Sequence, residues 1–312
     1  RKLLAFMTAM IAAFLVLAAC QAAQKPADTG KCFMWKVTSK TGTCYMLGTT
    51  HFAPEAMYPL DGAIEQGYRV SEKVVMEISM SMVRQMEAAA LALQRGMYPG
   101  TETAADHLSP ETLDKLEAYL AARGASLDAV TKMRPWLIAV TLVTLEYARL
   151  GYDANLGIDK HFYDKASAEG KPVLELESVD YQMSVFAELA PDVQEQFLLE
   201  TLDSMSKTAA FMESMIQAWR AGDPVALEMA MKEDMTENPK LKPMEKKLLA
   251  ERNKSMLAKI ERLLENDRSY FVMIGAGHLV GDEGIIASLE AKGYKVEQAE
   301  KEAAKAAAPG GI

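Results

Sequence analysis

Apolar residues occur along the chain in two patterns, short runs and longer segments with helical spacing. Short apolar runs bounded by turn residues are typical of buried strands. They predict strands at 33–37, 45–48, 73–78, 172–177, 270–274 and 294–296. Most of these runs lie toward the two ends of the chain, so we expect the sheet to be assembled from the first and last thirds.

The middle of the chain is expected to be helical, because proline and glycine punctuate long segments with helical spacing. Proline favours the first turn of a helix, and glycine favours the position just past the last one. Helices are predicted at 110–124, 135–150, 158–169, 191–221, 243–264 and 283–292, with another beginning after Asp223-Pro224. The predicted fold is therefore α/β (α+β), a central mixed sheet flanked by helices, with a large helical insertion at about 81–265.

Residues 1–19 have the pattern of a secretory signal peptide. Arg1 and Lys2 give a basic start, an apolar run follows, and Leu17-Ala18-Ala19-Cys20 is a lipobox. A transmembrane helix is the alternative, since the apolar run is near spanning length, but such a helix has no need of a lipobox. We expect cleavage before Cys20 and a lipid anchor on Cys20 that holds the protein at a membrane.

Glutamine rather than aspartate follows Cys20, which resembles an outer-membrane signal in enteric-type sorting. We therefore expect an exported protein of the bacterial cell envelope, lipid-anchored at the periplasmic face of the outer membrane. Residues 20–30 and 300–312 are polar and small, so we expect a flexible tether and a flexible tail on either side of a single domain at 31–299.

Two cysteines, Cys32 and Cys44, remain once Cys20 carries lipid. They flank the turn signal Thr41-Gly42 between two predicted strands, so a hairpin could bring them opposite each other. Because disulfides persist in exported compartments, we expect a Cys32–Cys44 bridge; two buried free thiols are the alternative.

The net charge limits the class of partner. It is −9, and it becomes −11 when the positive charges of Arg1 and Lys2 leave with the signal peptide. A protein that binds a phosphate backbone needs the opposite sign, so no nucleic-acid partner is expected. The 21 methionines are scattered at helical spacing, which favours core packing over a role in metal transfer.

Two segments repeat the order of a strand, a glycine, two small residues and a histidine. They are residues 48–51 (GTTH) and residues 275–278 (GAGH). Ligands of open α/β sheets bind at the carboxyl ends of strands, so the repeat predicts one site containing His51 and His278. Two unrelated structural histidines are the alternative. The glycines expected to let the chain turn and to clear space for an imidazole are Gly48, Gly275 and Gly277.

Carboxylates interrupt two of the predicted strands. Glu77 lies in the apolar run VVMEI, where a charge is costly unless it is paired, metal-bound or exposed at the strand end. Glu175 and Glu177 repeat this pattern in the run 172–177, where a solvent-facing edge explains Glu175 and the strand end makes Glu177 the better site candidate.

Other polar residues carry weaker signals. Arg252-Asn253 lies within a predicted helix and could bind carboxylates or stabilise a developing oxyanion, although spacing alone places both residues on a helix surface. His107 and His161 have no partner pattern, so structural roles are expected for both.

The order of these residues resembles the TraB/GumN family over nearly all of the chain after the expected signal peptide. That family in turn resembles the animal Tiki proteins, described as membrane-tethered metalloproteases with two glycine-histidine motifs, and more distantly erythromycin esterases and the haem-binding lipoprotein ChaN. The residues that carry the resemblance are Trp35-Lys36-Val37, residues 48–51, Glu77, Gly157-Ile158-Asp159, Gly170-Lys171, Leu176-Glu177, Trp219, Gly222-Asp223, Arg252-Asn253, residues 275–279, Gly281 and Gly293-Tyr294.

Three functions are consistent with this resemblance. The first is a metal-dependent hydrolase, most readily a peptidase, in which His51, Glu77 and His278 bind Mn, Co, Fe or Zn and Glu77 or Glu177 takes a proton from bound water. Arg252 and Asn253 would stabilise the oxyanion. The second is a metal-free hydrolase of the erythromycin-esterase type with His51 as general base, and the third is a lipoprotein that binds haem or another ligand without turnover. A peptide or small-molecule substrate is expected for the first two.

Overall fold

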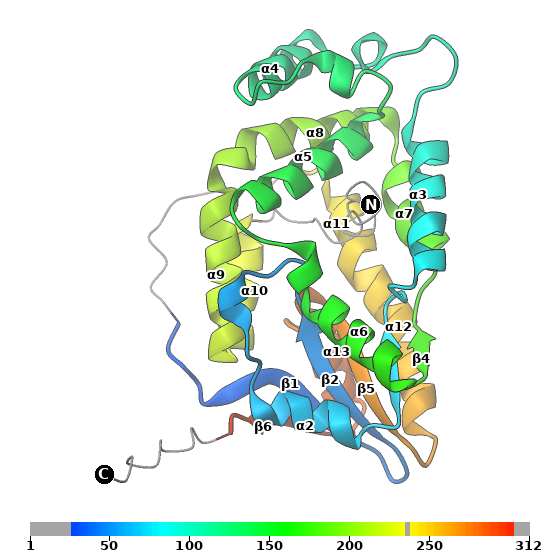
Figure 1. Ribbon diagram of the computed structural model, residues 1–312, viewed down its shortest axis with the longest axis vertical. Coiled ribbons are helices and arrows are strands. Elements are labelled where there is room, and N and C mark those ends of the chain that lie inside the picture. Colours follow the sequence, from blue (N-terminus) through cyan, green and yellow to red (C-terminus); the bar gives the residue numbers. More distant parts are fainter. Residues whose placement is uncertain (1–25, 235–237, 303–312) are drawn as a thin grey trace.

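The computed structural model describes residues 26–234 and 238–302 (Figure 1). The expected signal peptide and Cys20 lie outside these residues. Six strands form one sheet, and all six predicted strands are confirmed. They are β1 (Lys31–Thr38), β2 (Thr43–Thr49), β3 (Lys73–Met76), β4 (Val173–Glu175), β5 (Ser269–Gly275) and β6 (Lys295–Glu300).

The sheet is mixed, as predicted, with the strand order β4-β3-β5-β2-β1-β6. Strands β4, β3, β5 and β2 run parallel to one another, whereas β1 pairs antiparallel with both β2 and β6. The carboxyl ends of the four parallel strands therefore meet at one edge of the sheet. Since each of these strands leads into a loop at that edge, side chains from distant parts of the sequence converge there.

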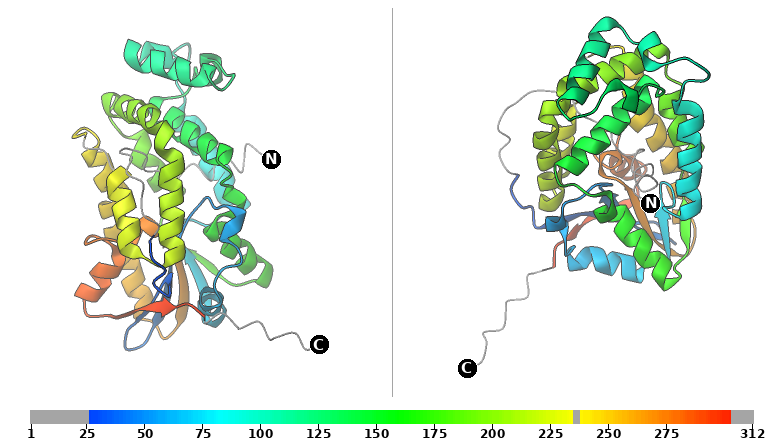
Figure 2. Two further views of the ribbon diagram at one scale, coloured as in Figure 1. Left: turned by 90° about the vertical axis from the view of Figure 1, so that its left-hand side faces the viewer. Right: turned by 45° about the horizontal axis from the view of Figure 1, so that its top comes forward.

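Helices cover both faces of the sheet (Figures 1 and 2). On one face lie α2 (Gly62–Val70) and α6 (Ile158–Glu169), and on the other lie α9 (Thr208–Ala221), α12 (Arg252–Leu264) and α13 (Ile285–Ala291). Three aromatic rings join the first pair of helices to β5, with centroid separations of 4.8 to 5.6 Å among Tyr68, Phe162 and Phe271. Burial of such large apolar side chains supplies the main driving force for this packing.

Part of the predicted helical insertion forms a roof beyond the carboxyl edge of the sheet (Figure 1), whereas α6, α9 and α12, which also belong to it, cover the faces of the sheet. Within the roof α5 packs on α8, α8 on α4, and α3 on α7. The insertion also contributes β4, so the sheet draws on the middle third of the chain as well. The helices of the insertion not yet given bounds are α3 (Met82–Gly96), α4 (Pro110–Ala121), α5 (Pro135–Arg149), α7 (Val179–Ala187), α8 (Pro191–Ser204), α10 (Pro224–Asp234) and α11 (Lys242–Lys246).

Two predicted helices are interrupted. The expected helix 191–221 is divided into α8 and α9 by a 3₁₀ turn (Met205–Lys207), where the hydroxyls of Thr201 and Ser204 donate to backbone carbonyls three or four residues earlier. Such bonds compete with the helical ladder and bend it. The expected helix 243–264 contains a π-helical turn (Lys247–Glu251) directly before Arg252, a device often found at functional sites.

The residues of the predicted tether and tail that lie next to the domain are paired with it, so both flexible segments were predicted too long. The N–H of Thr29 donates to the carbonyl of Ala221 at 3.0 Å, and the N–H of Lys301 donates to the carbonyl of Gly30 at 2.8 Å. Glu300 belongs to β6. Within the described ranges no helix has the length and hydrophobicity needed to cross a bilayer.

The predicted disulfide is wrong, because Cys32 and Cys44 are both free and buried. The register of β1 and β2 places Val37, not Cys32, opposite Cys44. Cys32 lies five residues before Val37 on β1, so the two cysteine Cα atoms are far beyond the roughly 7 Å limit for a disulfide. Burial raises the pKa of each thiol to about 12, with Asp61 adding to the effect at Cys32, so both behave as core side chains.

Candidate active site

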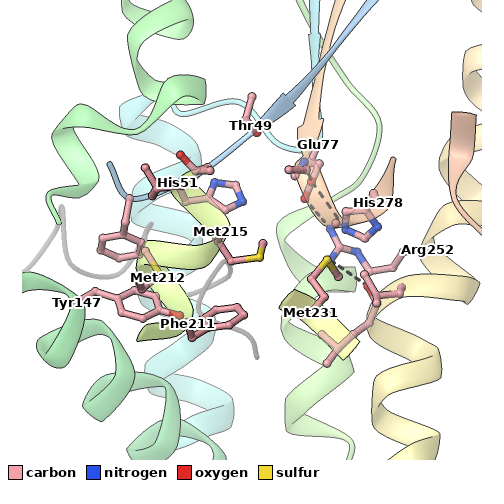
Figure 3. A pocket seen from close by; sticks show the side chains of 18 of the residues that line it. Thr49, His51, Glu77, Tyr147, Phe211, Met212, Met215, Met231, Arg252 and His278 are labelled. Atoms are coloured by element: carbon pink, nitrogen blue, oxygen red, sulfur yellow. Dashed lines mark hydrogen bonds and ion pairs between the residues drawn. The ribbon is translucent and has the colours of Figure 1, made fainter. Parts of the chain in front are cut away.

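Four strand ends deliver the predicted site residues to one place. His51 follows β2, Glu77 follows β3, and Glu177 follows β4, while His278 lies in the 3₁₀ turn (Ala276–His278) that follows β5. Figure 3 shows His51, Glu77 and His278 around one cavity. The register of the parallel strands therefore brings together residues as far apart in the sequence as His51 and His278, which are separated by 227 positions.

His51 is oriented by a carboxylate that comes from a different element. Its Nδ1 lies 2.5 Å from Oδ2 of Asp159, in the first turn of α6. The N–H of Ile158 donates to the carbonyl of Thr50 at 3.0 Å, which ties the start of α6 to the His51 loop. The carboxylate accepts the Nδ1 proton, so Nε2 carries the free lone pair when the ring is neutral.

The charge around His51 favours its protonation. Burial opposes a charged imidazole, but the carboxylates of Asp159 and Glu77 outweigh it and raise the pKa of His51. A pKa raised toward the working pH is the property expected of a general base.

The surroundings of His278, unlike those of His51, disfavour protonation of its imidazole. Its Nδ1 lies 2.6 Å from Oδ1 of Asn253, whose amide nitrogen donates to the carbonyl of Glu283 at 2.9 Å. Because that amide nitrogen must face the carbonyl, the Asn253 oxygen faces His278 and accepts the Nδ1 proton, which leaves a lone pair on Nε2. Burial and the guanidinium of Arg252 lower the pKa of His278 to about 3. This imidazole is therefore neutral and serves as an acceptor.

Glu77 belongs to a buried cluster of charges. Nη2 of Arg252 lies 2.6 Å from Oε2 of Glu77 and 2.7 Å from Oε2 of Glu177. The side-chain amide of Gln182 donates to the same two oxygens, at 3.0 and 2.8 Å. Burial acts to raise the pKa of Glu77, but Arg252 outweighs it and lowers this pKa to about 2. Glu77 is therefore a fixed negative charge rather than a proton carrier.

The motif glycines provide space at this edge. A Cβ on Gly275 would lie 3.3 Å from Oε1 of Glu77 and 4.0 Å from Nε2 of His51, and a Cβ on Gly48 would lie 2.6 Å from the ring of Phe33. The backbone N–H of Gly275 also donates to Oε1 of Glu77 at 2.7 Å. The predicted clearance is therefore present, although neither glycine has a positive φ.

A cavity of about 160 Å³ opens over these polar groups. Its floor contains His51, Glu77, Arg252 and His278 (Figure 3). A smaller cavity of about 50 Å³ shares His51 and Glu77 with it and reaches toward Asp159. The His51 imidazole and the Glu77 carboxylate thus lie where the two cavities meet, and His278 faces the larger one.

The model of the TraB/PrgY/gumN family matches residues 33–298, and all of the residues above fall inside the match. The chain belongs to the TraB/PrgY/gumN family. An uncharacterized protein, YbaP, of Escherichia coli K12 is 25% identical over 238 residues, which cover 76% of this chain and 84% of YbaP. An uncharacterized protein of Treponema pallidum is 22% identical over 265 residues, 80% of this chain and 78% of that protein. No solved structure gives a significant match.

The predicted residues of this TraB/PrgY/gumN chain take different positions in the site. Arg252 reaches the cavity floor, whereas Glu177 and Asn253 lie behind it, where they hold Arg252 and His278. The predicted oxyanion role of Asn253 therefore has no geometric support, because its amide is used by His278 and a backbone carbonyl. Glu175 lies outside the site and pairs with Arg84, in agreement with the strand-edge interpretation.

Two residues of the site were not identified from the sequence. Asp159 occurs in the family signature Gly157-Ile158-Asp159 but has no role that spacing would reveal, and Gln182 lies on α7 with no motif of its own. The two histidines outside the site are structural, as predicted. The ring of His107 stacks on Tyr98 at 4.3 Å, and that of His161 packs against Tyr58 and Phe162.

The donors at the floor match a transition metal in type but not in arrangement. Two imidazole nitrogens and one carboxylate oxygen suit Mn, Co, Fe or Zn. Glu77, however, already engages Arg252, Gln182 and the Gly275 N–H, and the described residues contain no group of three or more His, Cys, Asp or Glu side chains that could hold a metal ion. A metal bound by His51, Glu77 and His278 stays a prediction.

Proposed function

We propose that this protein is a hydrolase that uses water to cleave an acyl bond, an ester or an amide, with His51 as general base. The observation that carries this proposal is the Asp159–His51 pair, with Nδ1 on the carboxylate and Nε2 toward the cavity. A carboxylate-oriented imidazole at a cavity floor is a recurrent arrangement for activating a nucleophile.

The two histidines would have different roles, His51 as the proton acceptor and His278 as the group that orients the water. A water molecule between them can donate one hydrogen bond to Nε2 of His51 and another to Nε2 of His278. His51 takes the proton, because Asp159 raises its pKa, while His278 only orients the water, because its pKa is lowered to about 3. Arg252 partly offsets the charges of Glu77 and Glu177 at the floor, which lessens their repulsion of the developing oxyanion.

The dependence of kcat/KM on pH tests the role of Asp159. The base must be neutral, so activity rises with pH through the pKa of His51, which lies above the ordinary value of 6.5. In Asp159→Asn this rise moves to lower pH, because the charge that stabilises the imidazolium is lost, and the plateau falls. The control is Asp164→Asn, an exposed carboxylate on the same helix, which should leave the profile unchanged. An unshifted profile in Asp159→Asn would contradict the proposal.

Metal-dependent hydrolysis at the same floor is the second candidate. It is favoured by the closeness of two potential ligand atoms. Nε2 of His51 and Oε1 of Glu77 both lie within 4.0 Å of the position that a Cβ on Gly275 would occupy. His51, Glu77 and His278 would hold the ion, which would lower the pKa of its bound water. Activity that survives complete metal removal would exclude this candidate.

We also propose the cellular location that the sequence suggests, a lipid anchor at Cys20 at the periplasmic face of the outer membrane. The support is the lipobox and the glutamine that follows it. If this is correct, Cys20→Ala leaves the protein out of the washed membrane fraction; retention there would contradict the anchor.

A further inference from the structure

The walls of the larger cavity differ in chemistry from its floor. They are formed by apolar side chains of α9, α10 and the π-helical turn, and Figure 3 shows several of them facing the catalytic groups. Methionines are prominent among them, and their flexible thioethers adapt to apolar ligands of varied shape. The side chains of this wall are Phe211, Met212, Met215, Met231, Leu248 and Leu249.

The charges near this wall disfavour an anionic ligand. Arg252 is committed to Glu77 and Glu177, and its cluster carries a net negative charge. Glu245, which is buried, also lines the cavity and pairs with Lys242 at 3.0 Å. An anionic group would meet buried carboxylates, so a neutral apolar group is the better occupant.

The volume sets the size of that group. An engineered apolar cavity of about 150 Å³ in another protein holds benzene, a ligand of six carbon atoms. The present cavity, at about 160 Å³, therefore accommodates a similar group. We infer that the substrate carries a neutral apolar group of about six carbon atoms directly beside the scissile bond, seated against the methionine-rich wall. This inference rests on the proposed hydrolase function.

Hydrolysis of simple alkyl esters tests the inference on the full chain. The probes are methyl acetate, methyl hexanoate and hexyl acetate, with acid release measured by titration at constant pH. Burial of one methylene contributes a factor of about four, so at least one of the six-carbon esters should be cleaved with a kcat/KM more than tenfold above that of methyl acetate. Equal values for all three esters would overturn the inference while leaving the hydrolase proposal intact.

A matched pair of variants locates the effect. Met215→Trp fills the cavity and should reduce the preference for the six-carbon ester to less than a third of its original value. Met229→Trp is the control, because Met229 lies on α10 near Met231 but is 57% exposed. An unchanged preference in Met215→Trp, or an equal reduction in Met229→Trp, would overturn the inference.

A binding measurement separates this inference from the proposed function. Calorimetric titration with 1-hexanol needs no turnover, and it should show saturable binding that Met215→Trp weakens and Met229→Trp does not. If no ester is cleaved but hexanol binds in this way, the hydrolase proposal fails and the apolar site stands. Absence of hexanol binding would overturn the apolar site.

Discussion

Replacing His51 by alanine is expected to reduce kcat/KM for ester hydrolysis by about 10²- to 10⁴-fold, the range contributed by a positioned general base. The reason is that Nε2 of His51 is the acceptor that Asp159 prepares for a proton, with Nδ1 and Oδ2 2.5 Å apart. His278, with its pKa lowered to about 3, cannot replace it as a proton acceptor. Initial rates on methyl hexanoate measure the effect.

The matched control for this variant is His107→Ala. His107 packs on Tyr98 and pairs with Glu102 at the surface, remote from the cavity, so this change should leave kcat/KM within twofold of the native value. Circular dichroism and the urea midpoint establish that both variants are folded. A folded His51→Ala protein that retains more than a tenth of the native kcat/KM would contradict the general-base role.

Replacing Arg252 by methionine is expected to lower the free energy of unfolding by about 3 to 5 kcal/mol. The guanidinium bridges Glu77 and Glu177, and all three side chains are 10% exposed or less. Its removal leaves two buried carboxylates side by side without a cation, and this is far more costly than the loss of one surface ion pair. Urea denaturation at neutral pH measures the difference.

Two comparisons identify the cause of that loss. Arg84→Met breaks a contact of similar geometry with Glu175, but Arg84 is 37% exposed, so a much smaller loss of stability is expected than for Arg252→Met. Adding Glu177→Gln to Arg252→Met should recover part of the stability, because one unpaired charge is removed. Equal losses in Arg84→Met and Arg252→Met would contradict a role for burial.

The sequence was sufficient to predict the strands and the residues at their ends. Each strand is an apolar run bounded by turn residues, and a polar residue directly after such a run, as with His51, Glu77 and Glu177, must lie at an edge of the sheet. Where parallel strands are neighbours, the carboxyl-edge rule brings such residues together, and the structure shows that β4, β3, β5 and β2 are neighbours of this kind. The floor of the site was predictable for this reason.

The partners of those residues were not predictable, because they depend on tertiary packing. Asp159 reaches His51 only because α6 begins against the His51 loop, 108 residues later in the chain. Gln182 contacts Glu77 only because α7 follows β4 at the same edge. The disulfide prediction failed for a similar reason, since strand register rather than turn position decides which side chains of a hairpin face each other.

The central claim is that His51 performs hydrolysis without a metal, and one measurement tests it most directly. The native protein is stripped with a strong chelator, its metal content is verified by mass spectrometry, and kcat/KM on methyl hexanoate is compared before stripping, after stripping and after reloading with Mn, Co, Fe or Zn. We predict equal activity in all samples, and none above background in His51→Ala. Activity that disappears on stripping and returns with one metal would contradict the claim and establish the metal-dependent alternative. No activity in any sample would also contradict the claim and would favour the third function, ligand binding without turnover.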